Sequence, residues 1–346
     1  MRILLYTDVH WCCKSSIVNT KDNQFSTRLE NLINSVNWAE EQADINTCDS
    51  IICLGDFFDT PTLNAEEITA LQCVKWSKLH HYFLVGNHES NIADLSKSST
   101  QVLKALNFDV IDNIECRNYN NTEFYFIPYM VEENRPNIKD IVSQLSLNNN
   151  SNKIIFSHND IQMQYGAYKS KQGFTIDDIK DNCNLFLNGH LHNGEQFCDN
   201  GYNLGNLTGK NFSEDAFKYN HGAYILDTDT NKLKFIENPY AFNFYKLIIE
   251  NENDLNKINN LKSNAVVTIK CVNTLLESCK NLIKLKDIKH YKLLTYSAAD
   301  TSNITEIITA VNDLKIDHLQ QFSNYCFTKL QNRDIVEEEL NEVLHG

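Results

Sequence analysis

Side chains of the types that can bind metal ions follow five short apolar segments of this sequence, each with the length and composition of a β-strand. The segments span residues 2–7, 50–54, 81–85, 153–157 and 184–188. The side chains that follow them are Asp8, His10, Asp56, Asn87, His158, His190 and His192. Since open α/β sheets hold their ligands at the carboxyl ends of parallel strands, these groups are expected to lie together.

The types of side chain indicate the chemistry. Imidazole and carboxylate suit zinc, manganese or iron, and there is no thiolate among them to favour a structural zinc site. A carboxylate between two ligand groups can bridge two ions about 3.5–4 Å apart, the arrangement used for in-line displacement at phosphorus. Each residue alone has a plainer interpretation, because a Gly-Asp pair is a common turn and a lone histidine is usually packed in a core. Five such strand ends together favour a metal site.

The motifs around these residues resemble those of the calcineurin-like metallophosphoesterases. D-x-H, G-D-x-x-D, G-N-H-E, a lone histidine and G-H-x-H follow one another between residues 8 and 192, in the order of that family. The resemblance implies a mixed α/β (α+β) fold, a four-layer β-sandwich flanked by helices. One ion would be held by Asp8, His10, Asp56 and His192. The second would be held by Asp56, Asn87, His158 and His190.

The same resemblance assigns His88 as the general acid that faces the phosphate. Asp59 and Glu89 would be the outer groups that orient it. The family's protein phosphatases place an arginine after the second motif and another before the third, where they clamp phosphate. Here Thr60-Pro61 follows the second motif and Val85 precedes the third. These departures argue against a phosphoprotein substrate.

Three segments instead resemble the SbcD-type DNA repair nucleases. Residues 55–59, G-D-F-F-D, are similar to their G-D-L-F-D motif, and residues 127–129, I-P-Y, to their I-P-W/Y segment. Residues 202–205, Y-x-x-G before a hairpin, are similar to the phage members. The resemblance implies a DNA exo- or endonuclease of a double-strand-break repair and recombination complex. It would use two divalent ions, with manganese expected and magnesium as the alternative. Glu89 stands where these nucleases more often have aspartate.

Two other functions stay open. A metallophosphatase or a cyclic-nucleotide phosphodiesterase would use the same scaffold. A catalytically silent scaffold should have lost ligands, whereas every expected ligand position is filled here. The missing arginines, and the long segment after Pro239 that a phosphatase would not need, favour the nuclease.

Helical spacing alternates with the strands. Helices are predicted over 26–43, with Ser26 as N-cap, over 64–79, with Asn64 as N-cap, and over 98–106 and 138–147. Residues 222–227 and 232–237 predict an antiparallel hairpin in a second sheet that closes over the first. Strands at 244–250, 265–271 and 290–295, with helices over 253–262 and 273–281, predict a small α/β unit. We therefore expect a nuclease domain at 1–240, a capping domain at 241–300 and partner-binding helices at 301–346.

The last helices are predicted over 303–315, 317–330 and 333–344. One carries an apolar stripe formed by Leu319, Phe322, Cys326 and Leu330. The stripe either packs onto the capping unit or docks on the coiled coil of an SbcC-type ATPase, the partner that the resemblance implies. The resemblance also implies a homodimer, paired through the helices that follow the second and third motifs.

A lysine-rich segment at 280–292 is the predicted contact with the DNA backbone. Its lysines are Lys280, Lys284, Lys286, Lys289 and Lys292. A solvated face is the alternative, because Asp287 lies within the segment. Cys12 and Cys13 lie close to the first motif, but they are expected to pack rather than bind hard metals.

Composition restricts the remaining possibilities. A net charge of −14 over 346 residues argues against a protein that coats nucleic acid, although not against a nuclease that uses bound cations. The 11 cysteines show no paired spacing, which fits free thiols in a reducing cytoplasm, the host's if the protein is phage-encoded. No apolar run has the roughly 18 residues of a membrane span, so no contact with a membrane is expected.

Overall fold

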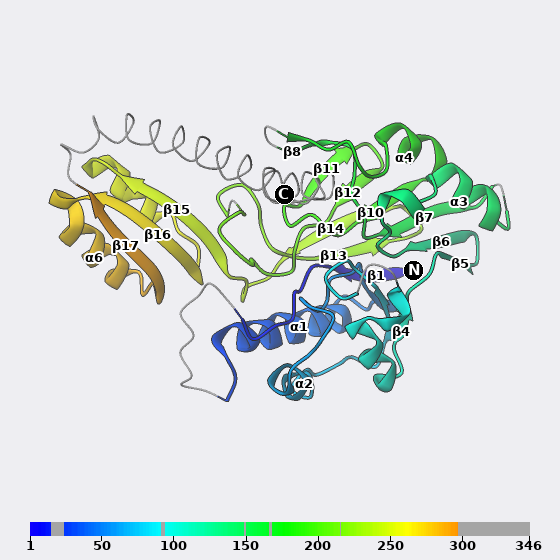
Figure 1. Cartoon of the computed structure of the whole chain (residues 1–346), viewed down its shortest axis with the longest axis horizontal. Helices are drawn as coiled ribbons and strands as arrows, with labels where there is room; N and C mark the ends of the chain where they lie inside the picture. The colour runs from blue at the N-terminus through cyan, green and yellow to red at the C-terminus, as the bar shows by residue number, and fades with distance from the viewer. Residues whose placement is uncertain (15–23, 91–93, 149, 166–167, 215, 297–346) are drawn as a thin grey trace, which may run out of the picture.

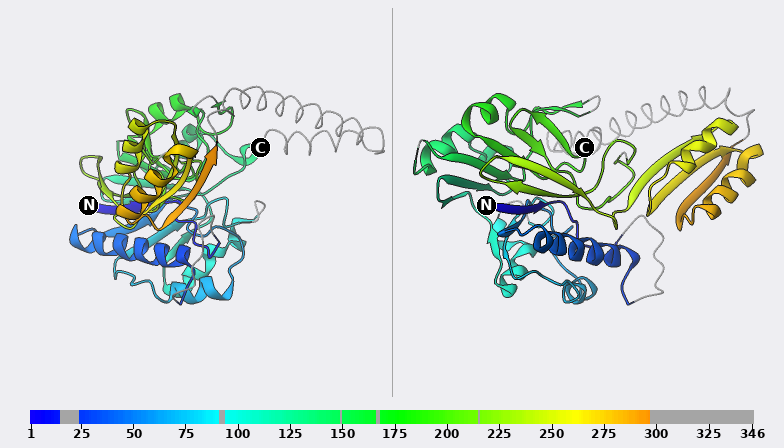
Figure 2. Two further views of the ribbon diagram at one scale, coloured as in Figure 1. Left: turned by 90° about the vertical axis from the view of Figure 1, so that its left-hand side faces the viewer. Right: turned by 180° about the vertical axis from the view of Figure 1, so that it is seen from behind.

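The computed structural model describes residues 1–14, 24–90, 94–148, 150–165, 168–214 and 216–296. Two six-stranded sheets form the larger part of it, and a three-stranded sheet lies at one end of the long axis (Figures 1 and 2). The three helices predicted between residues 303 and 344, with their apolar stripe, lie outside the described residues. Among the described helices, none is long and apolar enough to cross a membrane.

The first sheet has the strand order β14-β13-β1-β2-β3-β4. Its strands are β1 (Arg2–Tyr6), β2 (Ser50–Cys53), β3 (His80–Leu84), β4 (Asp109–Ile111), β13 (Gly222–Asp227) and β14 (Lys232–Glu237). The second sheet has the order β11-β12-β10-β7-β6-β5. Its strands are β5 (Glu115–Tyr119), β6 (Thr122–Ile127), β7 (Asn152–Ser157), β10 (Leu185–Asn188), β11 (Glu195–Cys198) and β12 (Gly201–Asn203). A short hairpin, β8 (Gln164–Tyr165) and β9 (Tyr168–Lys169), stands apart.

The two large sheets bury both of their faces, which explains their nearly continuous apolar strands. In β1, Ile3 and Leu5 point into the core between the sheets, whereas Leu4 and Tyr6 pack against helix α1 (Thr27–Ile45). The outer face of the second sheet packs on α3 (Ile138–Leu145) and α4 (Ile176–Asn182). Helices, sheet, sheet and helices thus form four layers (Figure 1). The predicted fold class is confirmed.

The predicted place of the hairpin was wrong. β13 pairs antiparallel with β1, with Leu4 opposite Ile225, so the hairpin extends the first sheet. The second sheet is instead built from residues 115–203. Alternation along a strand shows which side chains share a face, but it does not show which neighbouring strand pairs with it. β5, β11 and β12 were not predicted.

Two predicted helix starts are confirmed by their caps. The Ser26 side chain accepts a hydrogen bond from the backbone N–H of Leu29, and Asn64 forms a reciprocal capping box with Glu67. Helix α2 (Ala65–Leu71) is much shorter than predicted. The backbone N–H of Lys75 donates to Asn37 of α1, so the chain leaves the helical path soon after α2 ends.

Several other helices are short or 3₁₀. Residues predicted as a helix over 98–106 form η2 (Ser99–Leu106), a 3₁₀ helix that follows η1 (Leu95–Lys97). A further 3₁₀ turn is η3 (Glu132–Asn134). The region predicted as a helix over 253–262 is divided into η4 (Glu252–Leu255) and α5 (Asn256–Asn259).

The small sheet is parallel, with the order β15-β16-β17. Its strands are β15 (Asn243–Ile249), β16 (Ala265–Val272) and β17 (His290–Tyr296). The helical segments α5, η5 (Asn273–Leu275) and α6 (Leu276–Leu285) pack on one face, against Tyr245, Leu247 and Ile249 among others. The domain boundaries at 240 and 300 stay predictions.

Candidate metal centre

The metal-ligand side chains from the five strand ends meet at one edge of the two large sheets. One group holds Asp8, His10 and His192, and another holds Asp56, His158 and His190, with the ligand atoms of each group within 4.8 Å of one another. A third such group joins Asp56 with His10 and His88, so Asp56 is close to both of the others. The structure thus brings together the residues that the sequence selected.

The first group has the donors of a cation site. The Nε2 atoms of His10 and His192 are 2.9 Å apart, and Asp8 Oδ1 is 3.8 Å from the same atom of His10. Asp8 is fully buried, and its Oδ1 has no hydrogen-bond partner in the part of the chain that the structure describes. An unpartnered buried carboxylate oxygen is costly, and a bound cation between these three atoms would satisfy it. The residues present therefore fit a metal ion.

Asn87 adds a fourth donor to the second group. Asn87 Oδ1 lies 3.0 Å from His190 Nδ1 and 3.3 Å from His158 Nε2. Asp56 Oδ2 lies 3.2 Å from that same Nε2 atom. Oxygen and imidazole donors again converge without thiolates, which suits the ions that transfer phosphoryl groups. The role of each residue as a ligand stays a prediction.

Each of the four histidines in these two groups turns its second ring nitrogen to an acceptor outside the centre. The pairs are His10 Nδ1 with Asp59 Oδ1 at 3.0 Å, His158 Nδ1 with the Leu54 carbonyl at 2.6 Å, His190 Nε2 with Asp160 Oδ1 at 3.2 Å, and His192 Nδ1 with Glu214 Oε1 at 3.0 Å. Such outer partners fix the tautomer and orientation of metal-binding histidines. The pattern supports metal binding independently of the motifs.

Sequence reasoning missed Asp160 and Glu214. Asp160 follows His158 by two residues, and that spacing on a strand end was a usable signal. Glu214 lies in a loop 22 residues after His192, and nothing in the pattern of the loop marked it. Its carboxylate is buried and also accepts from Asn206 Nδ2 at 3.0 Å.

Glu89 does not lie where the resemblance placed it. Its carboxylate accepts from the backbone N–H groups of Phe58 and Gly86, at 2.9 and 2.7 Å, and so ties the second and third motif loops together. Burial, reinforced by the charge of Asp56, raises the pKa of Glu89 to about 7. A fully buried carboxylate needs donors, and the two loop amides supply them. The carboxylate beside His88 is that of Asp59, although it lies closer to His10.

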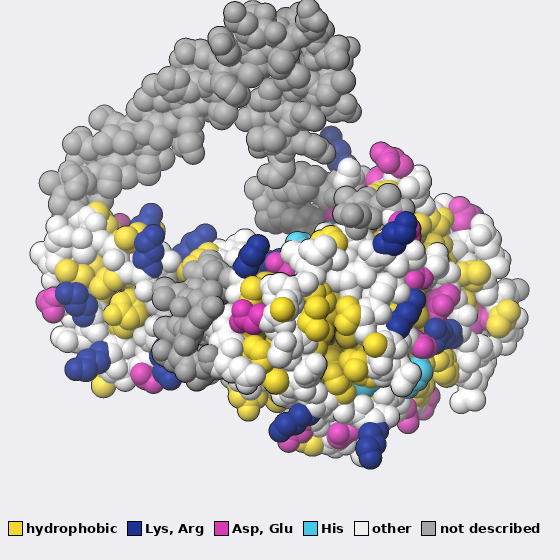
Figure 3. Space-filling model, turned by 60° about the horizontal axis from the view of Figure 1, so that its bottom comes forward, with side chains coloured by type: hydrophobic (Ala, Val, Ile, Leu, Met, Phe, Trp, Pro, Cys, Tyr) yellow, Lys and Arg dark blue, Asp and Glu magenta, His cyan; other side chains and the backbone are white. Residues whose placement is uncertain are grey.

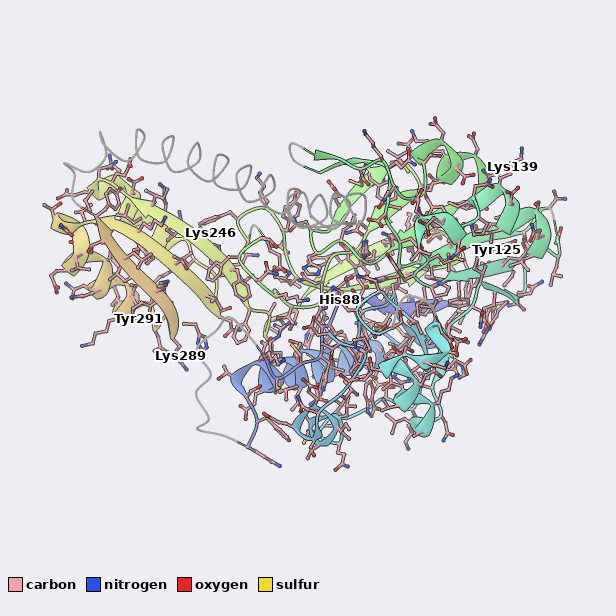
Figure 4. All side chains as sticks on the ribbon, in the orientation of Figure 1. His88, Tyr125, Lys139, Lys246, Lys289 and Tyr291 are labelled. Atoms are coloured by element: carbon pink, nitrogen blue, oxygen red, sulfur yellow. The ribbon has the colours of Figure 1, made fainter. Side chains whose placement is uncertain are left out.

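His88 lies beside the ligand groups and is partly open to solvent, with 38% of its side chain exposed. Its backbone N–H donates to Asp56 Oδ1 at 3.0 Å, and its Nδ1 is 3.2 Å from the carbonyl oxygen of Asp59. Its ring meets that of His10 edge to face, with centroids 4.8 Å apart. Figure 4 shows His88 at the end of the large sheets that faces the small sheet.

The protonation of the centre fits an ion site. Burial lowers the pKa of His10 to about 4, so the ring is neutral at pH 7, the form that binds metals. Burial would raise the pKa of Asp56, but the charge and hydrogen bond of His158 hold it well below its usual range. Burial alone would lower the pKa of His158, but the charge of Asp56 raises it to about 9. A cation bound there would displace the proton on this pair.

The backbone at the centre is held in an uncommon conformation. Asp8, His10, Asp56 and His190 all have φ between 49° and 76°, the left-handed region. Such backbone persists where the surroundings over-determine it, and it clusters at functional sites. At Gly55, with φ of 103°, a Cβ atom would lie 2.5 Å from Cγ of His158. The loops that carry the candidate ligands therefore leave no room for a side chain at this position.

Replacing Gly86 by alanine should disturb this packing. An added Cβ would meet Asp56 Oδ1 and lie 2.5 Å from the Asp56 backbone nitrogen. We expect a loss of about 1–3 kcal/mol in the free energy of unfolding, typical of overpacking, together with lost metal content. Denaturant titration and metal analysis by mass spectrometry measure the two effects. Gly222→Ala is the control, because it meets the Ile236 carbonyl in the hairpin and should destabilise without releasing metal. Full metal content in Gly86→Ala would contradict this assignment.

Cys13 packs against the core beneath α1, Cys12 is buried, and the described metal-ligand groups include neither. Cys12 is buried, and burial raises the pKa of its thiol to about 12. All ten described cysteines are free thiols.

The five lysines predicted to contact DNA do not share one surface. Lys280 and Lys284 lie on α6, which covers one face of the small sheet, whereas Lys292 is exposed on β17. Lys286 donates to the backbone carbonyls of Asn259 and Leu261, and Lys289 lies 3.9 Å from Asp287. On the face shown in Figure 3, Lys and Arg are likewise dispersed among Asp and Glu. The five lysines therefore do not form one strip, because helix and strand spacing send neighbouring lysines in different directions. Whether any of them contacts DNA stays a prediction.

The family model of the calcineurin-like phosphoesterases matches residues 1–194. No curated protein matches the sequence. The solved structures similar to this chain include the following two, both at low identity. The crystal structure of the protein TT1561 of Thermus thermophilus is 10% identical, with a TM-score of 0.41, over 68% of this chain and 98% of that one. A dimetal phosphatase from Danio rerio is 14% identical, with a TM-score of 0.38, over 65% of this chain and 91% of that one.

The match to the family model spans more than half of the chain, and the donor set of the centre agrees with it. The protein therefore belongs to the calcineurin-like phosphoesterase family and is a metal-dependent hydrolase of phosphoester bonds.

Proposed function

We propose that this hydrolase is a nuclease that cleaves phosphodiester bonds of DNA. It would work with two manganese ions, or magnesium as the alternative, as a homodimer and as the nuclease subunit of an SbcC/SbcD-type repair complex with a coiled-coil ATPase. The G-D-F-F-D and I-P-Y segments support this branch of the family, as does the absence of the phosphatase arginines. The observation that carries the proposal is a lysine-bearing face of the small sheet.

That face is the one opposite to α5 and α6. Side chains alternate along a strand, so the burial of Tyr245 and Leu247 under the helices turns Lys246 to the other side. Lys246, Thr268 and Lys292 stand side by side across the three strands, and Lys270 lies two residues further along β16. All three lysines are exposed. A parallel sheet is ordinarily covered on both faces.

Phe212 covers one end of this face, at Phe244 and Val266, and the three lysines lie on the part that stays open. Three lysines on one open surface suit a polyanion rather than a small phosphate ester. Ammonium groups bind the phosphates of nucleic acid as point charges, and each contact releases a counterion. Figure 4 labels Lys246 on β15, the small-sheet strand nearest to the large sheets. A substrate with phosphates beyond the scissile one would use this face, and a phosphomonoester would not.

At the centre, one ion would be held by Asp8, His10, Asp56 and His192, and the other by Asp56, Asn87, His158 and His190. When bound, two such ions polarise the phosphoryl group and lower the pKa of the attacking water. Asp59, Asp160 and Glu214 hold the histidine rings in place. His88 is partly exposed next to Asp56, where it can donate a proton to the leaving oxygen.

A phosphatase or a cyclic-nucleotide phosphodiesterase would use the same ions, and the family match fits these activities equally well. Purified protein with Mn²⁺ should therefore be given linear duplex DNA, p-nitrophenyl phosphate and bis-p-nitrophenyl phosphate separately. We expect cleavage of the DNA and of the diester. Cleavage of the monoester alone would identify a phosphatase instead.

Reversing the charge of the open face should weaken DNA cleavage selectively. Lys246→Glu with Lys292→Glu removes two phosphate contacts, so the salt dependence of DNA binding should become shallower by roughly two, at about 0.9 per contact. The rate on bis-p-nitrophenyl phosphate should not change, since the metal centre is intact. Filter binding at several salt concentrations and steady-state kinetics measure both.

The matched control is Lys280→Glu with Lys284→Glu, which makes the same charge change on α6. It should leave the salt dependence nearly unchanged. Equal losses of DNA binding in the two double variants would show that only the net charge of the protein matters. That result would remove the support for DNA binding on this face.

A further inference from the structure

One loop connects the metal centre with the small sheet. It follows β12 and contains Lys210, Phe212 and Glu214. Glu214 Oε1 lies 3.0 Å from His192 Nδ1, and the same carboxylate accepts from the Lys210 backbone N–H at 3.0 and 3.1 Å. Glu214 therefore contacts His192 and at the same time fixes the backbone of its own loop at Lys210.

Lys210 reaches the other histidine of the first ligand group. Its Nζ donates to Asp59 Oδ1 at 2.6 Å and lies 3.1 Å from His10 Nδ1. Asp59 is itself the outer partner of His10, at 3.0 Å. Lys210 thus holds the carboxylate that orients His10, and its ammonium group offsets the negative charge of that carboxylate.

The far side of the loop packs on the small sheet. The backbone N–H of Gly209 donates to the Phe242 carbonyl at 3.1 Å, and the Phe212 ring meets Phe244 of β15 with centroids 5.1 Å apart. Ala216 is buried in the core of the small sheet, and its neighbour Phe217 contacts Tyr245, with ring centroids 4.7 Å apart. The position of the loop therefore depends on the small sheet.

The outer partners of the other ligand group come from different elements. His158 turns to the carbonyl of Leu54, just after β2, and His190 turns to Asp160, just after β7. Both acceptors follow strands of the large sheets. Among the described residues, only the group with Asp8, His10 and His192 has outer partners linked to the loop.

From this asymmetry we propose that Glu214 and Lys210 are positioning residues that couple one ion position, at Asp8, His10 and His192, to the small sheet. The other ion position does not depend on the small sheet. A change in how the small sheet is held would then alter the affinity for one ion and leave the other bound. The proposal concerns Mn²⁺ alone and stands whether or not DNA is the substrate.

Calorimetric titration with Mn²⁺ tests it in the full chain. Glu214→Gln should weaken one of the two bound ions by roughly 10–100-fold, the usual effect of losing an outer partner of a metal ligand, and leave the other within twofold. Asp160→Asn is the matched control and should weaken the other ion. Lys210→Met should act like Glu214→Gln but more weakly, and Lys210→Arg should restore most of the affinity because it keeps the charge.

Variants that lack a ligand of one ion position show which of the two ions Glu214 affects. With His158→Gln, which removes a ligand of the second position, Glu214→Gln should still weaken the remaining ion. With His10→Gln it should have no further effect. Where a variant is too unstable for calorimetry, electron paramagnetic resonance of bound Mn²⁺ gives the number of ions bound. Equal weakening of both ions by Glu214→Gln would overturn the proposal.

The link to the small sheet has its own variant. Phe212→Ala removes the ring that rests on Phe244, in a residue that belongs to none of the described ligand groups, and should weaken the same ion as Glu214→Gln. Tyr291→Ala, an exposed residue of β17, is the control and should change neither. Unchanged binding of both ions in Phe212→Ala would refute the coupling to the small sheet.

Discussion

Replacing Asp56 by asparagine should abolish metal-dependent hydrolysis and leave a folded protein. Asp56 is close to both ligand groups, and its Oδ2 lies 3.2 Å from His158 Nε2. Asparagine has the same size and tolerates the φ of 49° found at this position, whereas alanine would add backbone strain to the lost charge. The loss of activity should exceed the roughly 100-fold that follows removal of an outer partner. Metal analysis, circular dichroism and phosphodiesterase assays measure the outcome.

Asp8→Asn provides the graded comparison. Asp8 also has a left-handed backbone, with φ of 52°, but it belongs to only one ligand group. Its loss should release one ion, whereas the loss of Asp56 should weaken both. Two ions still bound to Asp56→Asn would show that this carboxylate is not the bridge.

The clustering of the candidate ligands could be predicted from sequence because it depends on local features. An apolar strand that is buried on both faces is a continuous run, and its end is marked by a glycine or a polar residue. β2 ends before Gly55-Asp56 in this way, and β7 ends at Ser157, just before His158. Ser26 and Asn64 were likewise recognised by chemistry that operates within four residues.

Contacts between distant segments were not accessible to the same reasoning. Nothing in the sequence of β13 identifies its partner, and only the three-dimensional structure shows that it pairs with β1. The resemblance placed Glu89 as an outer group of His88, but its buried carboxylate reaches the backbone amides of Gly86, in its own motif, and of Phe58, in the second motif. Glu214 and Lys210 approach the centre from a loop whose path is set by the small sheet.

The lysines of the small sheet show the same limit of prediction from sequence. Lys280 to Lys292 are close in sequence, yet a helix and a strand place them on opposite sides of the sheet. Lys246 and Lys292 are far apart in sequence, and the register of three parallel strands places them in one row. A charged surface on a sheet is therefore found from strand pairing rather than from charge density along the chain.

The second large effect is expected at His88. His88→Gln should lower the rate of DNA cleavage by roughly 10²–10⁴, the usual contribution of a general acid, while both ions stay bound. The ring turns Nδ1 toward the carbonyl oxygen of Asp59, at 3.2 Å, which leaves Nε2 for the substrate. The backbone N–H donates to Asp56 Oδ1 and is unaffected by the substitution. The metal centre should therefore keep its geometry.

The leaving group separates proton donation from other roles of His88. A DNA 3′ or 5′ alkoxide needs a proton as it departs, whereas nitrophenolate is a weak base and leaves without one. His88→Gln should then lose far less activity on bis-p-nitrophenyl phosphate than on DNA. The ligand atoms of His88, His10 and Asp56 also lie within 4.8 Å of one another, so metal content must be measured in the same preparation. Loss of an ion would make His88 a ligand, and equal losses on the two substrates would make it a phosphate contact rather than the acid.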